Sequence, residues 1–192
     1  LAKALLPLKM GLNGSYDATF IFTLVNYGTD ILEKISLKDD LVSAFPGTEF
    51  KVKSITSTAS GNLKVNALFN GVSDTELLLP ASSISPVAKQ QQVILELNIK
   101  LLSGTGDFGN SAFVEGYSII DGQKVSDQST DGLRPDSNLG LPGNISHIVP
   151  TPVKLEKASL FIPGGFSPNN DGINDIFVIQ NASDHSISLE VY

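Results

Sequence analysis

The chain has 192 residues, of which 41% are hydrophobic and 17% charged, and this composition is typical of a globular protein rather than a disordered one. Its net charge of −7 repels phosphate backbones, so nucleic acid is not expected as a partner. The sequence contains no cysteine, which excludes disulfides, thiolate metal sites and cysteine catalysis. No run approaches the ~18 consecutive apolar residues of a membrane-spanning helix, so the chain is not expected to span a membrane.

The dominant pattern along the chain is an alternation of apolar and polar residues with a period of two, which predicts β-strands. The stretch 18–24 begins this pattern, and the longest and most regular strand is predicted over 93–101. Helical periodicity is weak, since the one apolar run that suits a helix, 1–8, is short and contains Pro7. The remaining predicted strands cover residues 35–41, 49–58, 63–68, 76–79 and 112–120.

Short strands separated by clusters of Gly, Asn, Pro and Ser predict an all-β fold, an antiparallel β-sandwich with one face of each sheet buried. After residue 120 the composition changes, and 121–143 is predicted as an acidic, Gly- and Pro-rich loop. The stretch 148–155 carries Pro150 and Pro152, which favour an edge strand or a stiff connector. Further strands are predicted at 176–180 and from residue 187 onward.

These segments divide the chain into three parts. A β-sandwich is expected over 1–155, a linker over 156–161, and the first strands of a second β-domain over 162–192. We expect the second domain to be incomplete, because the sequence stops inside an apparent strand.

No catalytic residues are predicted, and the chain is not expected to be an enzyme. The sequence holds two histidines, His147 and His185, and each lies in a polar stretch without an adjacent nucleophile. Seryl hydrolase turns, phosphate-binding glycine loops and paired zinc-ligand histidines are absent from the sequence.

Two acidic loops are candidates for calcium, the one cofactor that the sequence suggests. Each places oxygen-bearing side chains at alternate positions before a glycine, Gly132 or Gly172, but lacks the glutamate that closes a helix-flanked calcium loop. The alternative interpretation, which we prefer, is that Asn, Asp and Gly serve the turns themselves, because they tolerate left-handed backbone and bond their own main chain. The candidate ligands are Asp127, Asp131, Asp136 and Asn138 in the first loop and Asn169, Asp171, Asn174 and Asp175 in the second.

The most specific resemblance lies in residues 166–177, which read FSPNNDGINDIF. This segment resembles the opening of the gliding-motility-associated C-terminal domain of Bacteroidetes, whose pattern runs FSPNGDGxNDxF, and Asn170 is the one departure. That family is the type B sorting signal of the type IX secretion system. The matching residues are Phe166, Ser167, Pro168, Asn169, Asp171, Gly172, Asn174, Asp175 and Phe177.

The resemblance implies export across the outer membrane and display at the cell surface or release from it. It also implies contact with the type IX secretion translocon and its outer-membrane shuttle protein. Because the chain begins at Leu1 rather than with methionine, we expect it to be a processed piece with an export signal upstream.

A second resemblance covers residues 1–155, which are similar to a repeat found in tandem in bacterial surface proteins. It depends on YDATFIFTLVNYG at 16–28, ISLKDDL at 35–41 and VSDQSTDG at 125–132. Such repeats are immunoglobulin-like sandwiches that act as stalk modules in large adhesins, so an immunoglobulin-like fold is implied here. Arg134 replaces an acidic residue of the family pattern, which weakens the case for calcium.

Three functions follow as hypotheses. The preferred one is a non-catalytic stalk module joined to a sorting signal for export and surface attachment, in adhesion or gliding. The alternatives are the C-terminal tail of a secreted enzyme, and a calcium-dependent module that binds a surface glycan or protein. The sequence singles out no recognition surface, so the binding module ranks below the stalk module.

Overall fold

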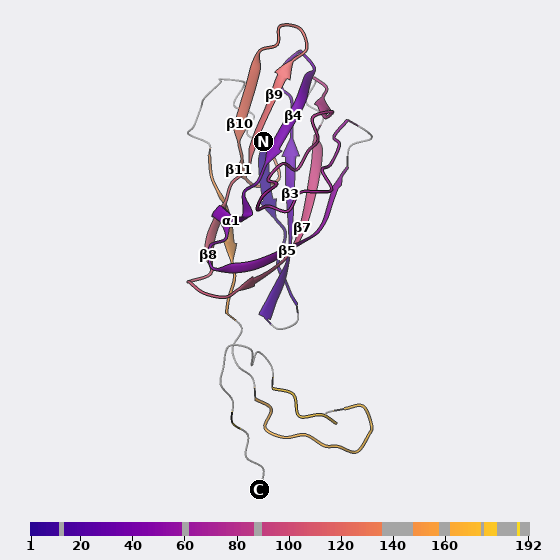
Figure 1. Ribbon diagram of the computed structural model, residues 1–192, viewed down its shortest axis with the longest axis vertical. Helices are drawn as coiled ribbons and strands as arrows, with labels where there is room; N and C mark the ends of the chain where they lie inside the picture. The colour runs from indigo at the N-terminus through magenta and orange to yellow at the C-terminus, as the bar shows by residue number, and fades with distance from the viewer. Residues whose placement is uncertain are drawn as a thin grey trace.

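The computed structural model describes residues 1–11, 14–58, 62–86, 90–135, 148–157, 162–173, 175–179 and 188. Its ribbon is an elongated sandwich whose longest strands run roughly along the long axis, with the described residues beyond 162 lying outside the sandwich (Figure 1). Within the described part of the chain, the regular structure is β-strand apart from one short helix.

The largest sheet has six strands and supplies most of the core. Its order is β11-β1-β3-β7-β5, with β2 paired to the start of β3. All pairs are antiparallel except β1 with β11, which is parallel. The strands are β1 (Ala2–Leu5), β2 (Lys9–Met10), β3 (Ser15–Leu24), β5 (Thr48–Ser57), β7 (Gln91–Leu101) and β11 (Thr130–Asp131).

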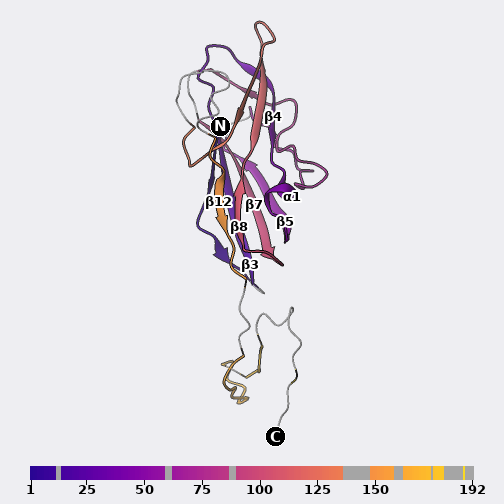
Figure 2. The same ribbon diagram turned by 90° about the vertical axis from the view of Figure 1, so that its left-hand side faces the viewer.

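Two smaller sheets complete the sandwich. A four-stranded sheet has the order β10-β9-β4-β6. The strands β12 and β8 pair in a two-stranded sheet and lie side by side in Figure 2. The strands are β4 (Leu32–Lys38), β6 (Ser83–Ile84), β8 (Asp107–Asn110), β9 (Phe113–Ser118), β10 (Lys124–Gln128) and β12 (Thr151–Lys154). The helix α1 (Leu41–Ala44) follows β4, and the side chain of Asp40 caps it by accepting a hydrogen bond from the Ser43 amide.

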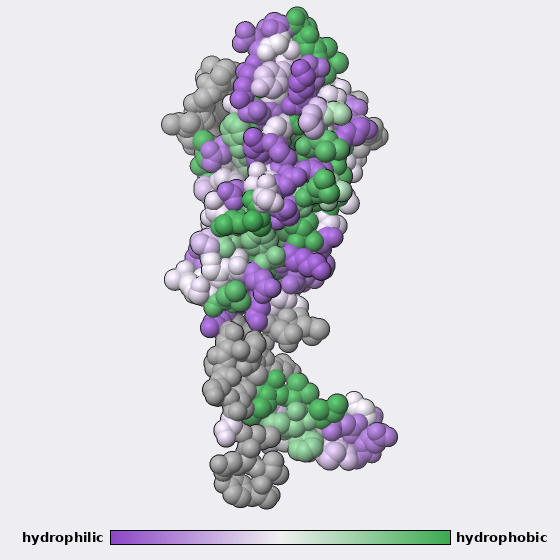
Figure 3. Space-filling model, in the orientation of Figure 1, coloured by the Kyte–Doolittle hydropathy of each residue, from purple (hydrophilic) through white to green (hydrophobic). Residues whose placement is uncertain are grey.

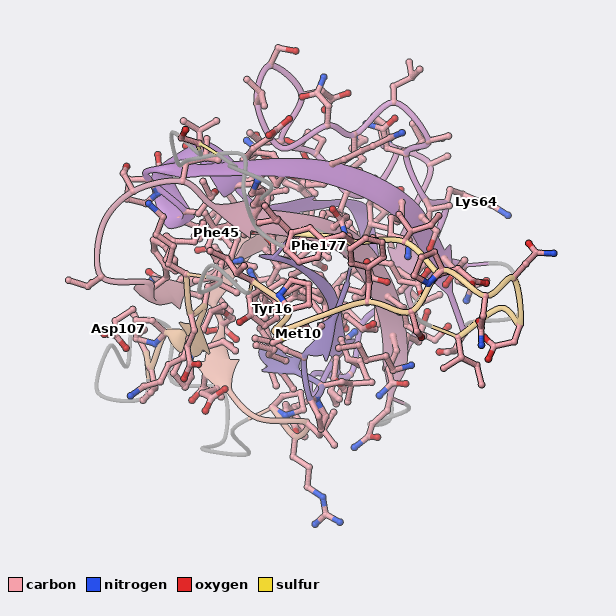
Figure 4. The ribbon with its side chains drawn as sticks, turned by 90° about the horizontal axis from the view of Figure 1, so that it is seen from below. Met10, Tyr16, Phe45, Lys64, Asp107 and Phe177 are labelled. Atoms are coloured by element: carbon pink, nitrogen blue, oxygen red, sulfur yellow. The ribbon has the colours of Figure 1, made fainter. Side chains whose placement is uncertain are left out.

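The core forms because alternate residues of facing strands point inward. Phe20 of β3 and Leu95 of β7 are fully buried and belong to one cluster with Leu37 of β4. Phe45 extends this cluster, with its ring centroid 6.1 Å from that of Phe20 and 5.6 Å from that of Phe108. Seen from below, Phe45 lies toward the middle of the molecule while Lys64 points outward at its rim (Figure 4). The predicted all-β fold with an antiparallel sandwich is confirmed.

A close approach of backbone fixes the lower end of the sandwich. The Leu155 amide donates to the Gly106 carbonyl at 2.8 Å, which holds the end of β12 against the loop before β8. A Cβ at position 106 would overlap the carbonyl oxygen of Leu155, and the φ of 79° there also favours glycine. Glycine is therefore required where these two segments meet.

The strands predicted over 18–24, 49–58, 93–101 and 112–120 are confirmed. The apolar run 1–8, considered for a helix, instead forms β1, which lies between β3 and β11.

Other predicted elements differ from the structure. Leu41 begins α1 rather than continuing a strand, because the Asp40 side chain caps a helical turn there. The stretches 63–68 and 76–79 form isolated bridges, not strands, since the Asn66 side chain bonds nearby backbone groups and turns the chain. The described residues 176–179 carry no strand assignment, and none of the described residues pairs with them.

The predicted loop 121–143 contains β10 and β11, which the sequence did not reveal. Nearly every residue of β10 is exposed, so the strand presents no alternating apolar face and its pairing with β9 alone defines it. Strands at a sheet edge that are polar on both faces carry no periodic signal.

No helix among the described residues has the length and apolar character that a membrane crossing requires.

We predict that Leu97→Ala lowers the free energy of unfolding by about 2–5 kcal/mol, because it removes a fully buried side chain of β7 and leaves a cavity. Urea unfolding followed by circular dichroism measures the change. The matched control is Leu68→Ala, a residue with 79% of its surface exposed, which should change stability by less than about 0.5 kcal/mol. Equal effects of the two substitutions would contradict the assignment of Leu97 to the core.

Candidate functional site

The segment 166–177 closes on itself through its two aromatic ends. The rings of Phe166 and Phe177 meet edge to face, with their centroids 5.7 Å apart. Between them, the Ser167 hydroxyl donates to the Ile173 carbonyl at 3.4 Å. These contacts form a compact loop from the residues that resemble the sorting motif.

Asp175 organises the turn inside this loop. One of its carboxylate oxygens accepts from the Asn170 amide and the other from the Gly172 amide, each at 2.7 Å. Both amides come from residues in the left-handed region, with φ values of 61° for Asn170 and 83° for Gly172. Asparagine tolerates this region better than other non-glycine residues, so the departure from the family pattern at position 170 preserves the turn.

Asp171 and Asn169 form the second half of the turn. The Asp171 carboxylate accepts from the Ile173 amide at 2.7 Å and from the Asn169 side-chain amide at 2.8 Å. These hydrogen bonds, the backbone one first, lower the pKa of Asp171 below its usual value. The carboxylate oxygens of this loop therefore already serve as acceptors for the loop itself, as the turn interpretation expects.

The structure describes only some of the candidate calcium ligands. Asp127 lies on β10 and Asp131 on β11, and Asp136, Asn138 and Asn174 lie outside the described residues. In the described part of the chain, no group of three or more His, Asp or Glu side chains is placed to hold a metal ion. Calcium binding stays a prediction. His147 and His185 also lie outside the described residues.

We predict that Asp175→Ala releases the amides of Asn170 and Gly172, because it removes their shared acceptor. Backbone amide chemical shifts measured by NMR should change most at these two residues and remain unchanged in β3 and β7. Asp131→Ala is the control, since it removes a carboxylate from the sandwich and should leave the loop amides in place. Unchanged amide shifts at 170 and 172 would show that Asp175 does not organise the turn.

The same NMR sample tests the calcium hypothesis. The turn interpretation predicts that addition of calcium chloride leaves the amides of Asp171 and Asp175 unshifted. A saturable shift at these residues would instead establish a calcium site in this loop.

A second cluster lies inside the sandwich, where Lys3, Asp39 and Asn110 are each at most 1% exposed. Lys3 comes from β1, Asp39 follows β4, and Asn110 ends β8, so the cluster joins all three sheets. The Lys3 ammonium donates to Oδ2 of Asp39 at 2.7 Å, and the Asn110 side-chain amide donates to the same oxygen at 3.4 Å.

The backbone around this cluster fixes its geometry. Thr151 of β12 pairs in register with Asn110, and its hydroxyl donates to the Lys3 carbonyl at 2.7 Å. The Asp39 amide donates to the Thr75 carbonyl at 3.0 Å. Hydrogen bonds of the main chain thus hold the backbone at Asp39 and the strands that carry Lys3 and Asn110.

The surroundings of Lys3 are apolar. Its Nζ lies 5.0 Å from the ring centroids of both Phe20 and Phe22. Burial lowers the pKa of Lys3 to about 8, although the charge and hydrogen bond of Asp39 act in the opposite direction. Burial also raises the pKa of Asp39 above its usual value, against the effect of Lys3. Both shifts favour the neutral forms of the two groups.

Two oxygens of the cluster lack hydrogen-bond partners. These are Oδ1 of Asp39 and Oδ1 of Asn110, both buried. An unsatisfied buried acceptor costs about 1–3 kcal/mol, so a native protein that keeps two of them together calls for an explanation. By contrast, the exposed pair of Lys53 and Asp17, 3.0 Å apart, contributes little to stability.

Sequence reasoning missed this cluster. The available signals were a single lysine inside the apolar run at the N-terminus and an aspartate, Asp39, inside the predicted strand at 35–41. A charged residue in a strand that is otherwise buried is unusual unless it is paired. The partners are distant in sequence, and only the fold brings them together.

No family model and no curated protein matches this chain. Two solved structures are similar to it. Domains D2 and D3 of the major pilin SpaD from Corynebacterium diphtheriae match with a TM-score of 0.43 and 13% identity, over 67% of this chain and 49% of that one. The full-length SpaD pilin matches with the same TM-score, identity and coverage of this chain, over 33% of its own length. This chain spans about half or less of those proteins, and similarity at this level assigns it no function.

Proposed function

We propose that this chain is a non-catalytic part of an exported cell-surface protein, in which the β-sandwich is a stalk module and residues 162–192 begin a type IX secretion sorting signal. The partners of the signal would be the secretion translocon and its outer-membrane shuttle protein. The observation that carries the proposal is the segment 166–177, whose sequence resembles the sorting motif and in which Phe166 contacts Phe177 and Asp175 accepts hydrogen bonds from two backbone amides.

The shape of the sandwich supports a spacer role. Two of the longest strands, β3 and β7, pair over ten residues and lie along the long axis of the molecule (Figure 1). Their inward side chains form one cluster with those of the facing sheet. A closed core of this kind resists bending, which suits a module that holds another domain away from a surface.

The surface of the segment after the sandwich supports a role in protein contact. Figure 3 shows apolar side chains gathered on this part of the molecule. Contiguous exposed apolar side chains on a soluble protein mark sites of interaction, and a secretion machine that reads the segment would cover them. The large apolar residues exposed here are Ile162, Phe166, Ile173, Ile176 and Val178.

We predict that deletion of residues 166–192 abolishes surface display in a bacterium that carries a type IX secretion system, because the segment that the translocon reads is lost. Protease accessibility on whole cells and immunoblotting of cell fractions measure the change. The control is Leu68→Ala, an exposed substitution on the sandwich, which should leave display unchanged. Normal display of the deletion variant would contradict the sorting assignment.

The adhesin and enzyme-tail alternatives differ in what else the full protein contains. Further copies of the sandwich would support an adhesin, and a catalytic domain would support the tail of a secreted enzyme. The sorting proposal holds in both cases, so the two questions are tested separately.

A further inference from the structure

The buried cluster of Lys3, Asp39 and Asn110 has the composition of a reaction site rather than of a structural ion pair. We infer that the side chains of Lys3 and Asn110 become joined by an amide bond within the folded sandwich, with Asp39 moving the protons. The inference is independent of the proposed function.

The geometry brings the three groups to one point. Oδ2 of Asp39 lies 2.7 Å from Nζ of Lys3 and 3.4 Å from the side-chain amide of Asn110. The amine of Lys3 and the carboxamide of Asn110 therefore lie next to each other, because both contact Oδ2 of Asp39. The contacts of Thr151 with Lys3 and Asn110 hold the two strands in place, so little motion is needed for the reacting atoms to meet.

The amine of Lys3 is prepared as a nucleophile. Only the neutral amine has a lone pair to attack with, and burial lowers the pKa of this group to about 8. At neutral pH the neutral fraction is then on the order of a few hundredfold larger than for an exposed lysine. The rings of Phe20 and Phe22 keep water away from it.

The carboxyl group of Asp39 is prepared as an acid and base. Burial raises its pKa above the usual value, which favours the protonated form. The oxygen and nitrogen of an asparagine side chain are distinguished by hydrogen bonding alone. Turning the Asn110 amide by half a rotation places its unpartnered Oδ1 against Oδ2 of Asp39, where a protonated carboxyl donates to it and polarises the carbonyl carbon.

The reaction balances without any co-reactant. Nζ of Lys3 attacks Cγ of Asn110 and forms a C–N bond, and Asp39 transfers a proton from the attacking amine to the departing Nδ2. The bond from Cγ to Nδ2 then breaks and ammonia leaves. A neutral amine and a carboxamide give one secondary amide and one ammonia, and Asp39 ends in the protonation state in which it began.

Asn110 is favoured over Asp39 as the group attacked. If Asp39 were the electrophile, water would leave, and no other acid or base among the described residues contacts the amine to move the protons. Attack on Asn110 uses all three buried side chains, with Asp39 as the group that moves the protons. The bond would tie the N-terminal strand β1 to β8 across the sandwich.

The test is the intact mass of the purified, folded chain. We expect it to be lower than the mass of the sequence by one ammonia. Tryptic digestion should yield a branched peptide in which residues 1–9, uncleaved at Lys3, are joined to residues 101–124. Tandem mass spectrometry should locate the branch at Lys3 and Asn110.

Three variants should each retain the full sequence mass, because each removes one participant: Lys3→Met, Asp39→Asn and Asn110→Ala. The matched control is Lys53→Met, which removes an exposed lysine that is also paired with an aspartate and should still show the loss of ammonia. If a variant fails to fold, the intact mass of the unaltered chain alone shows whether the amide bond has formed.

Three results would overturn the inference. The first is an unaltered chain with the full sequence mass. The second is the loss of one water with a branch at Asp39. The third is the loss of ammonia without a branched peptide, which is the mark of a succinimide at an Asn-Gly pair such as Asn70–Gly71.

Discussion

The burial of Lys3 against Asp39 between aromatic rings constrains the rest of this structure. Removing an ammonium and a carboxylate from water costs about several kcal/mol for each ion, and their mutual attraction offsets this only when the geometry is good. Here the contact is 2.7 Å and both side chains are almost completely buried. The segments that carry them must therefore meet in one arrangement, because any other register would leave a polar group buried in the core without its partner. An amide bond at this point would make that arrangement permanent.

The alternating strands explain how the cluster is placed. Lys3 pairs in register with Phe22 on β3, and the next strand, β7, continues the same sheet through the longest ladder in the described residues. The facing sheet ends at Lys38, so Asp39 enters the core as the chain leaves β4 for α1. The same core thus also excludes water from the cluster, and the loop closed by Phe166 and Phe177 lies outside it.

The sequence predicted those parts of the molecule whose signal is local. Alternation revealed β3, β5, β7 and β9, and the motif at 166–177 indicated a turn that Asp171 and Asp175 do form. It did not reveal β10, which has no apolar face, or β1, whose apolar run fits either a helix or a strand. The buried cluster could not be predicted, because Lys3, Asp39 and Asn110 are brought together only by the packing of three sheets.

A high-resolution crystal structure of the folded chain would show directly whether Lys3 and Asn110 are joined. Continuous electron density is expected from Nζ of Lys3 to Cγ of Asn110, with the Asp39 carboxyl in contact with the new amide. A Lys3 side chain directed to solvent, or one buried but separated from Asn110 by a non-bonded distance, would contradict it.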